Sequence, residues 1–324
     1  MKILILGGHG FIGSHVARQL VDLGHTVSIA DCHHTYGEYE SWEYNPVLEQ
    51  RKSYMGEHQE YIGDVTNPLF MEGVFYKVKP DRVIDLATYP NAKMVKENVI
   101  DATTNMISAT AIALDLCVKH KVERFVLASS SMVYGDFDAF DGAPDETCTP
   151  DPFTLYGSYK LQCERMCKIW HKEHGLEYSL LRPSALYGTR DMVVRVISKM
   201  AINAITNGKI HVHGADNRLD FSWVEDVASA FVQATLHENA ANQIFNCTRG
   251  NGRKIIEAAE IVQQHVTSNI VTHPHDDFYP NRDTLNSNKL REYTDWNPTV
   301  DIETGIPEYM EWLLSQEYLF NFKP

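Results

Sequence analysis

The chain has 324 residues, of which 44% are hydrophobic and 22% charged, and its formal net charge is −14. This length suits one two-lobed enzyme unit or two modest domains, and the composition is that of a soluble globular protein. The acidic balance disfavours nucleic acid and anionic membranes as partners, because both require an excess of Lys and Arg. Since there is neither a bilayer-length apolar run nor a signal-peptide pattern, we expect a cytoplasmic protein.

Short apolar strands alternate with helical segments along residues 1–182. Strands are expected at 2–7, 25–31, 60–65, 82–87, 124–131 and 177–184, with helices over 11–24, 98–120 and 156–174. This alternation predicts an α/β fold with a doubly wound, mostly parallel sheet of the Rossmann type.

Residues 183–324 are expected to form mainly a smaller, substrate-binding lobe, with residues near 222–240 returning to the first domain. Ser222 and Glu225 have the spacing of a capping box and predict a helix start. The polar stretch 33–59 is expected to be an elaborated loop or helix near the cofactor edge.

The first chemical motif is GGHGFIG at residues 7–13. It fits GxGxxG through Gly8, Gly10 and Gly13, and GxxGxxG through Gly7, Gly10 and Gly13. Glycines in such a turn let the backbone approach a pyrophosphate, which then faces a helix N-terminus. Asp31 ends the next strand, where an acid binds the adenosine ribose. No Lys or Arg lies between Asp31 and Gln50 to receive a 2′-phosphate, so the motif favours NAD over NADP.

The second motif is YGSYK, in which Tyr156 and Lys160 are one helical turn apart. A tyrosine with its reference pKa of about 10 is a poor base at neutral pH. A neighbouring ammonium group favours the phenolate, and so prepares the tyrosine to accept a proton. A second YxxxK, Tyr89 to Lys93, contains a proline and is interpreted as a loop.

Metal binding and disulfides are not expected. The six cysteines are scattered without a CxxC pair. The His-containing clusters CHH (32–34), HVH (211–213) and HPHDD (273–277) are interpreted as surface and loop residues.

With these motifs in order, the chain resembles the extended short-chain dehydrogenases/reductases, the NAD-dependent epimerase/dehydratase family acting on nucleotide sugars, with UDP-glucose 4-epimerase as the type. The resemblance extends over GGHGFIG, GDV, DLA, SSSMVYG, YGSYK, RPSALYG, LDFSWVEDVA and WNP, which is nearly the whole chain. It implies a nucleotide-diphosphate sugar substrate and a homodimer formed through the helix after the fourth strand and the helix carrying Tyr156.

The motifs and the resemblance together indicate the site residues. Tyr156, Lys160 and Ser130 are the expected catalytic residues. The expected cofactor-binding residues are Gly7, Gly10, Phe11, Ile12, Gly13, Asp31, Asp64, Val65, Leu86, Ala87, Thr88, Asn105, Ala128, Tyr156, Lys160 and Pro183. The expected substrate-binding residues are Ser130, Ser131, Met132, Tyr156, Ala185, Arg195, Arg218 and Arg282.

Ser131 and Met132 carry the prediction about the reaction. In the 4,6-dehydratases of the family these two positions hold Asp and Glu, which eliminate water, and the decarboxylases typically have Glu at the second. Neither Ser nor Met is a strong acid or base, so oxidation and re-reduction at C4 through a 4-keto sugar is the expected chemistry, that of a 4-epimerase.

Two departures from the family pattern leave alternatives open. Ala185 replaces an Asn, and Leu219 replaces an Arg that would contact the diphosphate, unless Arg218 reaches in instead. A nucleotide-sugar 4-dehydrogenase or 4-ketoreductase, for example one acting on a GDP-heptose, is the main alternative. A non-catalytic NAD-binding protein is a further one.

Overall fold

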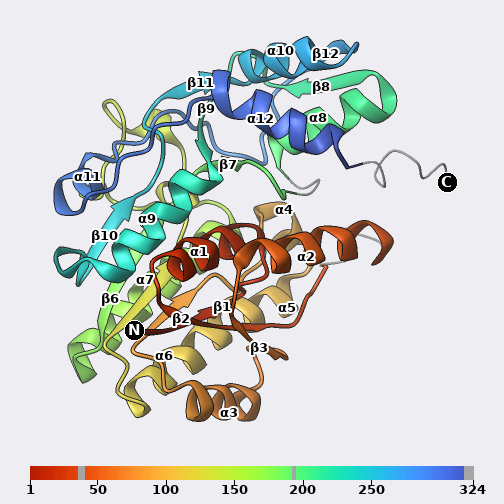
Figure 1. Cartoon of the computed structure of the whole chain (residues 1–324). Helices are drawn as coiled ribbons and strands as arrows, with labels where there is room; N and C mark the ends of the chain where they lie inside the picture. Colours follow the sequence, from red (N-terminus) through yellow and green to blue (C-terminus); the bar gives the residue numbers. More distant parts are fainter. Residues whose placement is uncertain (36–40, 192–194, 317–324) are drawn as a thin grey trace.

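The computed structural model describes residues 1–35, 41–191 and 195–316. Within these residues, seven strands form one sheet in which every neighbouring pair is parallel (Figure 1). Their order across the sheet is β10 (Gln243–Asn246), β6 (Glu177–Arg182), β5 (Arg124–Ala128), β4 (Arg82–Asp85), β1 (Lys2–Leu6), β2 (Thr26–Asp31) and β3 (Gln59–Ile62). From β3 inward this is the Rossmann order, so the predicted doubly wound fold is confirmed.

Helices cover both faces of this sheet, which explains why its central strands are continuous apolar runs rather than alternating ones. One face packs against α1 (Phe11–Asp22) and α9 (Val224–Leu236), with α2 (Ser41–Met55) beside α1. The other face packs against α3 (Pro68–Val78), α6 (Ala109–Lys119) and α7 (Leu155–His174) (Figure 1). The sheet is therefore the middle layer of three.

Shorter elements connect these layers. They are α4 (Ala92–Glu97), α5 (Val99–Thr103), a π-helical turn at Thr104–Ser108, α11 (Asn288–Tyr293) and 3-10 turns at Ser131–Tyr134, Phe137–Ala139 and Glu238–Ala240.

A second, smaller lobe lies above the carboxyl ends of the strands in Figure 1. Its sheet holds β11 (Gly252–Lys254), β9 (Arg218–Trp223) and β7 (Ala185–Tyr187), and a parallel pair joins β8 (Lys209–His213) to β12 (Asn269–His273). The helices α8 (Val196–Asn207), α10 (Ile255–His265) and α12 (Ile302–Leu314) pack around an apolar core of their own. In open α/β sheets ligands bind at this carboxyl edge.

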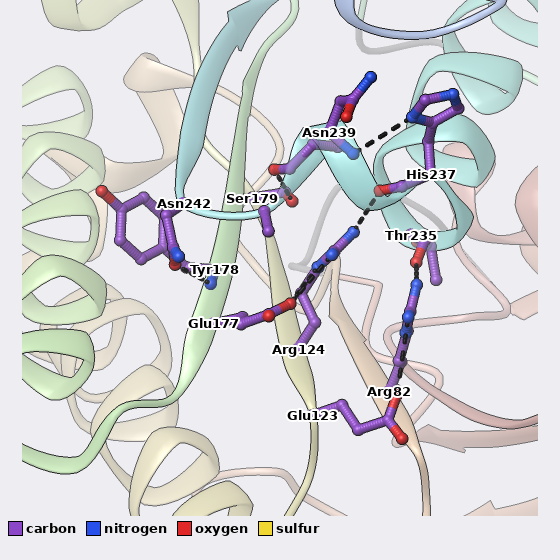
Figure 2. Close-up of polar contacts among 12 residues, drawn as sticks. Arg82, Glu123, Arg124, Glu177, Tyr178, Ser179, Thr235, His237, Asn239 and Asn242 are labelled. Carbon is purple, nitrogen blue, oxygen red and sulfur yellow. Dashed lines mark hydrogen bonds and ion pairs between the residues drawn. The ribbon is translucent and has the colours of Figure 1, made fainter.

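Two arginines of the large sheet form hydrogen bonds with the C-terminal end of α9 (Figure 2). Arg124, only 2% exposed, donates to the carbonyl oxygens of Ala234 at 3.2 Å and His237 at 2.7 Å, and Arg82 donates to the carbonyl of Thr235. The last carbonyls of a helix have no partner within the helix and carry partial negative charge, so guanidinium groups stabilise them. These bonds hold α9 against the sheet, and β10 follows as its edge strand.

The helix predicted to start at SWVED is present as α9, but Ser222 is not its N-cap. Ser222 belongs to β9, where its Oγ accepts the backbone N–H of Arg249 at 2.9 Å, and α9 begins at Val224 with Trp223 as its N-cap. Pairing between β7 and β9 continues through Trp223, which leaves Ser222 inside the sheet.

The stretch 33–59 contains a helix, as α2 spans Ser41–Met55, although residues 36–40 lie outside the described residues. Among the described helices, none combines the length and apolarity that crossing a membrane would require.

Candidate active site

The glycine-rich turn joins β1 to α1 at the carboxyl edge of the sheet. Gly7 has a φ of +73°, and a Cβ atom there would lie 2.7 Å from the backbone nitrogen of Ala87. A Cβ on Gly13 would lie 2.6 Å from the carbonyl oxygen of Gly7. α1 begins at Phe11 after Gly10, without a side-chain cap, so its first N–H groups are available to an anion. The turn therefore fits a dinucleotide pyrophosphate.

Asp31 is fixed at the end of β2 beside this turn. One carboxylate oxygen accepts the backbone N–H of His9 at 3.0 Å and the other that of His33 at 2.8 Å. The side chain lines the same cavity as the glycines. A carboxylate held in this way has lone pairs left for ribose hydroxyls.

Tyr156 and Lys160 lie on the first two turns of α7, which Thr154 caps by accepting the N–H of Gly157. The Nζ of Lys160 is 5.9 Å from the centroid of the Tyr156 ring. Lys160 is 3% exposed and donates to the carbonyl of Ala128 at 2.6 Å. Its ammonium group therefore lies close enough to stabilise a phenolate at Tyr156.

Ser130 follows β5 and caps a 3-10 turn. Its Oγ accepts the backbone N–H of Met132 at 3.2 Å, which leaves its own proton free for another oxygen. Ser130, Tyr156 and Lys160 line one wall of the cavity that also contains the glycine turn and Asp31.

A buried ion pair supports this wall from behind. Glu164 accepts two hydrogen bonds from Arg182, at 2.8 and 2.7 Å, and one from Ser129 Oγ at 2.5 Å. Because Ser129 precedes Ser130 and Arg182 precedes Pro183, the pair holds the ends of β5 and β6 in place.

Asp85 is buried, with 5% of its surface exposed, and lines a small cavity together with Lys160. Its carboxylate accepts the N–H of Ala87 at 3.2 Å and the hydroxyl of Thr110 at 3.3 Å. Burial raises the pKa of Asp85 to about 6, and the positive charge of Lys160 opposes that rise. The group thus titrates closer to neutrality than an ordinary aspartate.

Most of the predicted site residues converge on the one cavity. The predicted residues that line it are Gly7, Gly10, Phe11, Ile12, Gly13, Asp31, Val65, Leu86, Ala87, Thr88, Asn105, Ala128, Ser130, Tyr156, Lys160, Pro183 and Arg195. Asn105 lies in the π-helical turn, and its side-chain oxygen is buried without a hydrogen-bond partner. An unsatisfied group of this kind fits a ligand or an ordered water.

Other predicted residues are not part of the lining in the described part of the chain; these are Asp64, Ser131, Met132, Ala185, Arg218 and Arg282. Asp64 is exposed, and its carboxylate accepts the N–H of Thr66 at 2.8 Å. Ser131 is fully buried, and its N–H is bonded to the carbonyl of Pro183 at 2.8 Å.

Two arginines predicted to bind the substrate, Arg218 and Arg282, have different surroundings. Arg218 points away, to Asp283 and the carbonyl of Gly252, while Leu219 is buried on β9. In this structure the guanidinium of Arg218 is thus engaged with Asp283 and Gly252 and is not part of the cavity lining. Arg282 is half-buried, its enclosed Nε lacks a hydrogen-bond partner, and burial lowers its pKa.

Arg51 is a cavity residue that sequence reasoning missed. Its guanidinium donates to the carbonyl oxygens of Arg190, at 2.7 and 3.1 Å, and of His9 at 3.3 Å. Arg51 directly follows Gln50, where the stretch without Lys or Arg ends. Its place in the lining depends on how α2 packs beside α1, for which the sequence carried no signal.

Arg195 lines the cavity over the dinucleotide turn, with its guanidinium carbon 4.7 Å from the centroid of the Phe11 ring. It forms an ion pair of 2.5 Å with Asp191, which is 1% exposed and was not predicted.

The second YxxxK pair has no place in this site. Tyr89 is buried in a connection and its hydroxyl donates to Asp101, whereas Lys93 lies exposed on α4 and pairs with Glu97. The prediction of a loop holds for Tyr89 and is wrong for Lys93, because Asn91 caps a short helix.

Comparison with known proteins agrees with this geometry. Residues 3–248 match the NAD dependent epimerase/dehydratase family. The chain belongs to that family. This confirms the expected enzyme class, an extended short-chain dehydrogenase/reductase, and its NAD cofactor.

Individual relatives of this family member are distant but match it over nearly its whole length. It is 28% identical over 322 residues to a Methanocaldococcus jannaschii protein with the provisional name UDP-glucose 4-epimerase, covering 96% of this chain and 98% of the other. It is 27% identical over 325 residues to UDP-glucuronic acid decarboxylase 1 of Xenopus tropicalis, covering 94% and 70%. The UDP-glucuronic acid 4-epimerase of Bacillus cereus, solved with UDP-glucuronic acid and NAD, has the same fold, with a TM-score of 0.88 at 21% identity over 97% and 99% of the two chains.

Proposed function

We propose that this enzyme is a nucleotide-sugar 4-epimerase that oxidises its substrate at C4 and reduces the 4-keto sugar from the other face. The observation that carries the proposal is the composition of the cavity wall. Tyr156, Lys160 and Ser130 line it together, whereas Ser131 and Met132, which follow Ser130, supply no carboxylate. This set suits hydride transfer without elimination.

The residues have distinct tasks in such a reaction. Ser130 donates a hydrogen bond to the C4 oxygen and orients it, the Tyr156 phenolate accepts the proton of the C4 hydroxyl, and Lys160 stabilises that phenolate beforehand. The glycine turn would hold NAD, which would supply the hydride acceptor for the oxidation and the hydride donor for the reduction. Tyr156 gives the proton back when the carbonyl is reduced.

The acidic residues of the cavity have other partners. In the described chain the lining carboxylates are Asp31, bonded to two backbone N–H groups, and Asp191, paired with Arg195. Neither follows Ser130 as the dehydratase acids of the family do. Elimination of water therefore lacks its catalysts.

Binding of the nucleotide diphosphate falls to the C-terminal lobe in this proposal. Arg282 is positively charged, and its Nε atom has no hydrogen-bond partner. The phenol of Tyr156 contributes to the electrostatic environment of this guanidinium. A guanidinium of this kind suits a diphosphate. The nucleotide itself is left open between UDP, GDP, dTDP and CDP.

One observation favours a second candidate, a nucleotide-sugar 4-dehydrogenase or 4-ketoreductase. Leu219 is buried where the family often has a diphosphate-binding Arg, and Arg218 is turned to Asp283. Ala185 likewise offers no amide. The substrate pocket thus differs from that of the commonest epimerases, although the hydride-transfer residues are all present.

The experiment is a panel of UDP-, GDP-, dTDP- and CDP-sugars with products followed by mass and by proton NMR. A 4-epimerase gives an isomer of unchanged mass without consuming added NAD. A product two hydrogens lighter, formed with stoichiometric NADH, supports the dehydrogenase. Loss of water or carbon dioxide contradicts both.

Tyr156→Phe tests the base within the same panel. Turnover should fall by about 100- to 10,000-fold, the usual contribution of a general acid–base group, while NAD remains bound. Tyr159→Phe is the matched control, because Tyr159 lies on the same helix and its hydroxyl bonds Thr103 at 2.9 Å instead. Equal loss in both variants would place the base elsewhere.

A cytoplasmic homodimer is part of the proposal. Ile100 on α5 is 82% exposed, and Leu155 and Ile169 on α7 are 43% and 45% exposed. Apolar side chains in such positions suit a subunit contact. Light scattering should give the molar mass of a dimer for the parent protein. For Ile100→Asp the mass should fall towards that of a monomer on dilution.

A further inference from the structure

Behind the glycine-rich turn, two histidines and a glutamate from separate segments converge at the edge of the large sheet. His9 comes from the turn itself, His58 precedes β3, and Glu60 lies on β3, the edge strand. The Nε2 atom of His9 is 3.2 Å from Glu60 Oε1, and Nε2 of His58 is 3.1 Å from the same oxygen. All three ligand atoms lie within 4.8 Å of one another.

His9 is completely buried, and its Nε2 has no hydrogen-bond partner although it is aimed at this cluster. Its other ring nitrogen, Nδ1, lies 2.9 Å from Nε2 of His33. With Nδ1 as the donor of that bond, the lone pair of His9 Nε2 faces a carboxylate oxygen. The other tautomer of His9 places a proton between Nε2 and Glu60 Oε1, so a metal ion at this point takes the place of that proton.

We propose that His9, His58 and Glu60 form a binding site for a divalent transition-metal ion of the Zn²⁺ type. Bonds of about 2.0–2.1 Å in a tetrahedral site place ligand atoms about 3.3 Å apart, close to the 3.2 and 3.1 Å that separate the two histidine nitrogens from Glu60 Oε1. Two imidazoles and one carboxylate are a recognised zinc ligand set, with a fourth position left for water.

The surroundings hold the three ligands in place. The Asp31 carboxylate accepts the backbone N–H groups of both His9 and His33. This fixes the backbone of His33, whose imidazole contacts that of His9. Such outer contacts orient metal-binding histidines. Lys52 binds the second oxygen of Glu60 at 3.1 Å, which leaves Oε1 as a single ligand atom and makes the site weaker than a four-ligand one.

An ion has access to the site from solvent. The Glu60 side chain is 31% exposed and that of His58 is 8% exposed, whereas His9 forms the closed end. Occupancy would fasten the edge strand β3 to the dinucleotide turn. This departs from the absence of a metal expected from sequence, and it is independent of the sugar chemistry proposed above.

The test is Zn²⁺ titration of untagged, chelator-treated protein by calorimetry, with Co²⁺ absorption as a second readout. We expect one Zn²⁺ per chain and a visible Co²⁺ band typical of a four-coordinate site. Glu60→Gln and His58→Ala should each lose at least about 10-fold in affinity. His211→Ala, which removes an exposed histidine on β8, is the control and should bind as the parent does.

Thermal unfolding with and without Zn²⁺ shows whether the ion binds the folded protein at this site. Zn²⁺ should raise the Tm of the parent and of His211→Ala, because an ion that binds the folded state stabilises it. It should leave the Tm of Glu60→Gln and His58→Ala unchanged, while circular dichroism without metal shows both to be folded. Equal Zn²⁺ affinity in parent and Glu60→Gln, or no saturable binding in the parent, would overturn the proposal.

Discussion

Replacing Glu164 with Gln should destabilise the protein by several kcal/mol. Glu164 has no exposed surface and Arg182 is 1% exposed, so the charge of each is balanced almost entirely by the other. The carboxylate accepts three hydrogen bonds, two from Arg182 and one from Ser129. Gln keeps the shape but loses the charge and turns an amide N–H₂ towards these donors. Breaking one partner of a buried pair costs about 3–5 kcal/mol.

Urea unfolding followed by circular dichroism measures this loss directly. The control is Asp22→Asn, which removes an exposed ion pair of 2.7 Å with Arg18 on α1 and should change the unfolding free energy by about 0.5 kcal/mol or less. A double variant with Met at both Glu164 and Arg182 should recover part of the stability, because no uncompensated charge is left. A loss below about 1 kcal/mol in Glu164→Gln would refute the reasoning.

Asp31→Asn should weaken NAD binding and reduce the preference for NAD over NADP, as measured by titration with each cofactor. If the parent protein binds NAD and NADP equally, Asp31 does not select the cofactor. Asp85→Asn should change how stability depends on pH. Because burial raises the pKa of Asp85 from 3.8 to about 6, its ionisation costs the folded state up to about 3 kcal/mol as the pH rises through that range. The unfolding free energy of Asp85→Asn minus that of the parent should therefore increase between pH 4.5 and pH 7, and a constant difference would contradict this account.

Much of the fold and of the candidate site could be predicted from local patterns. Gly7 and Gly13 are required because backbone approaches there exclude a Cβ, and a requirement of this kind is visible as a glycine in the sequence. Tyr156 and Lys160 are one helical turn apart, so their relation follows from helical periodicity. Apolar strands covered on both faces are likewise recognisable as continuous runs.

The capping role predicted for Ser222 illustrates where local patterns fail. The spacing to Glu225 is correct for a capping box, yet the pairing of β9 with β7 takes Ser222 into the sheet. Glu225 instead lies 3.6 Å from His15 on α1. A contact between strands distant in sequence thus overrode a local preference.

The sequence by itself determined the family, the sheet, the dinucleotide turn and the residues we propose for hydride transfer, because each depends on neighbours a few positions away. Only the tertiary structure decided which charges meet across the chain. It placed Arg51 in the cofactor cavity, turned Arg218 away to Asp283, and brought His9 against Glu60. The positions of Arg51 and Glu60 depend on how α2 and β3 pack beside the turn, and the pairing of Arg218 with Asp283 depends on the fold of the second lobe. Side-chain charges carry no sequence signal for a partner fifty residues away.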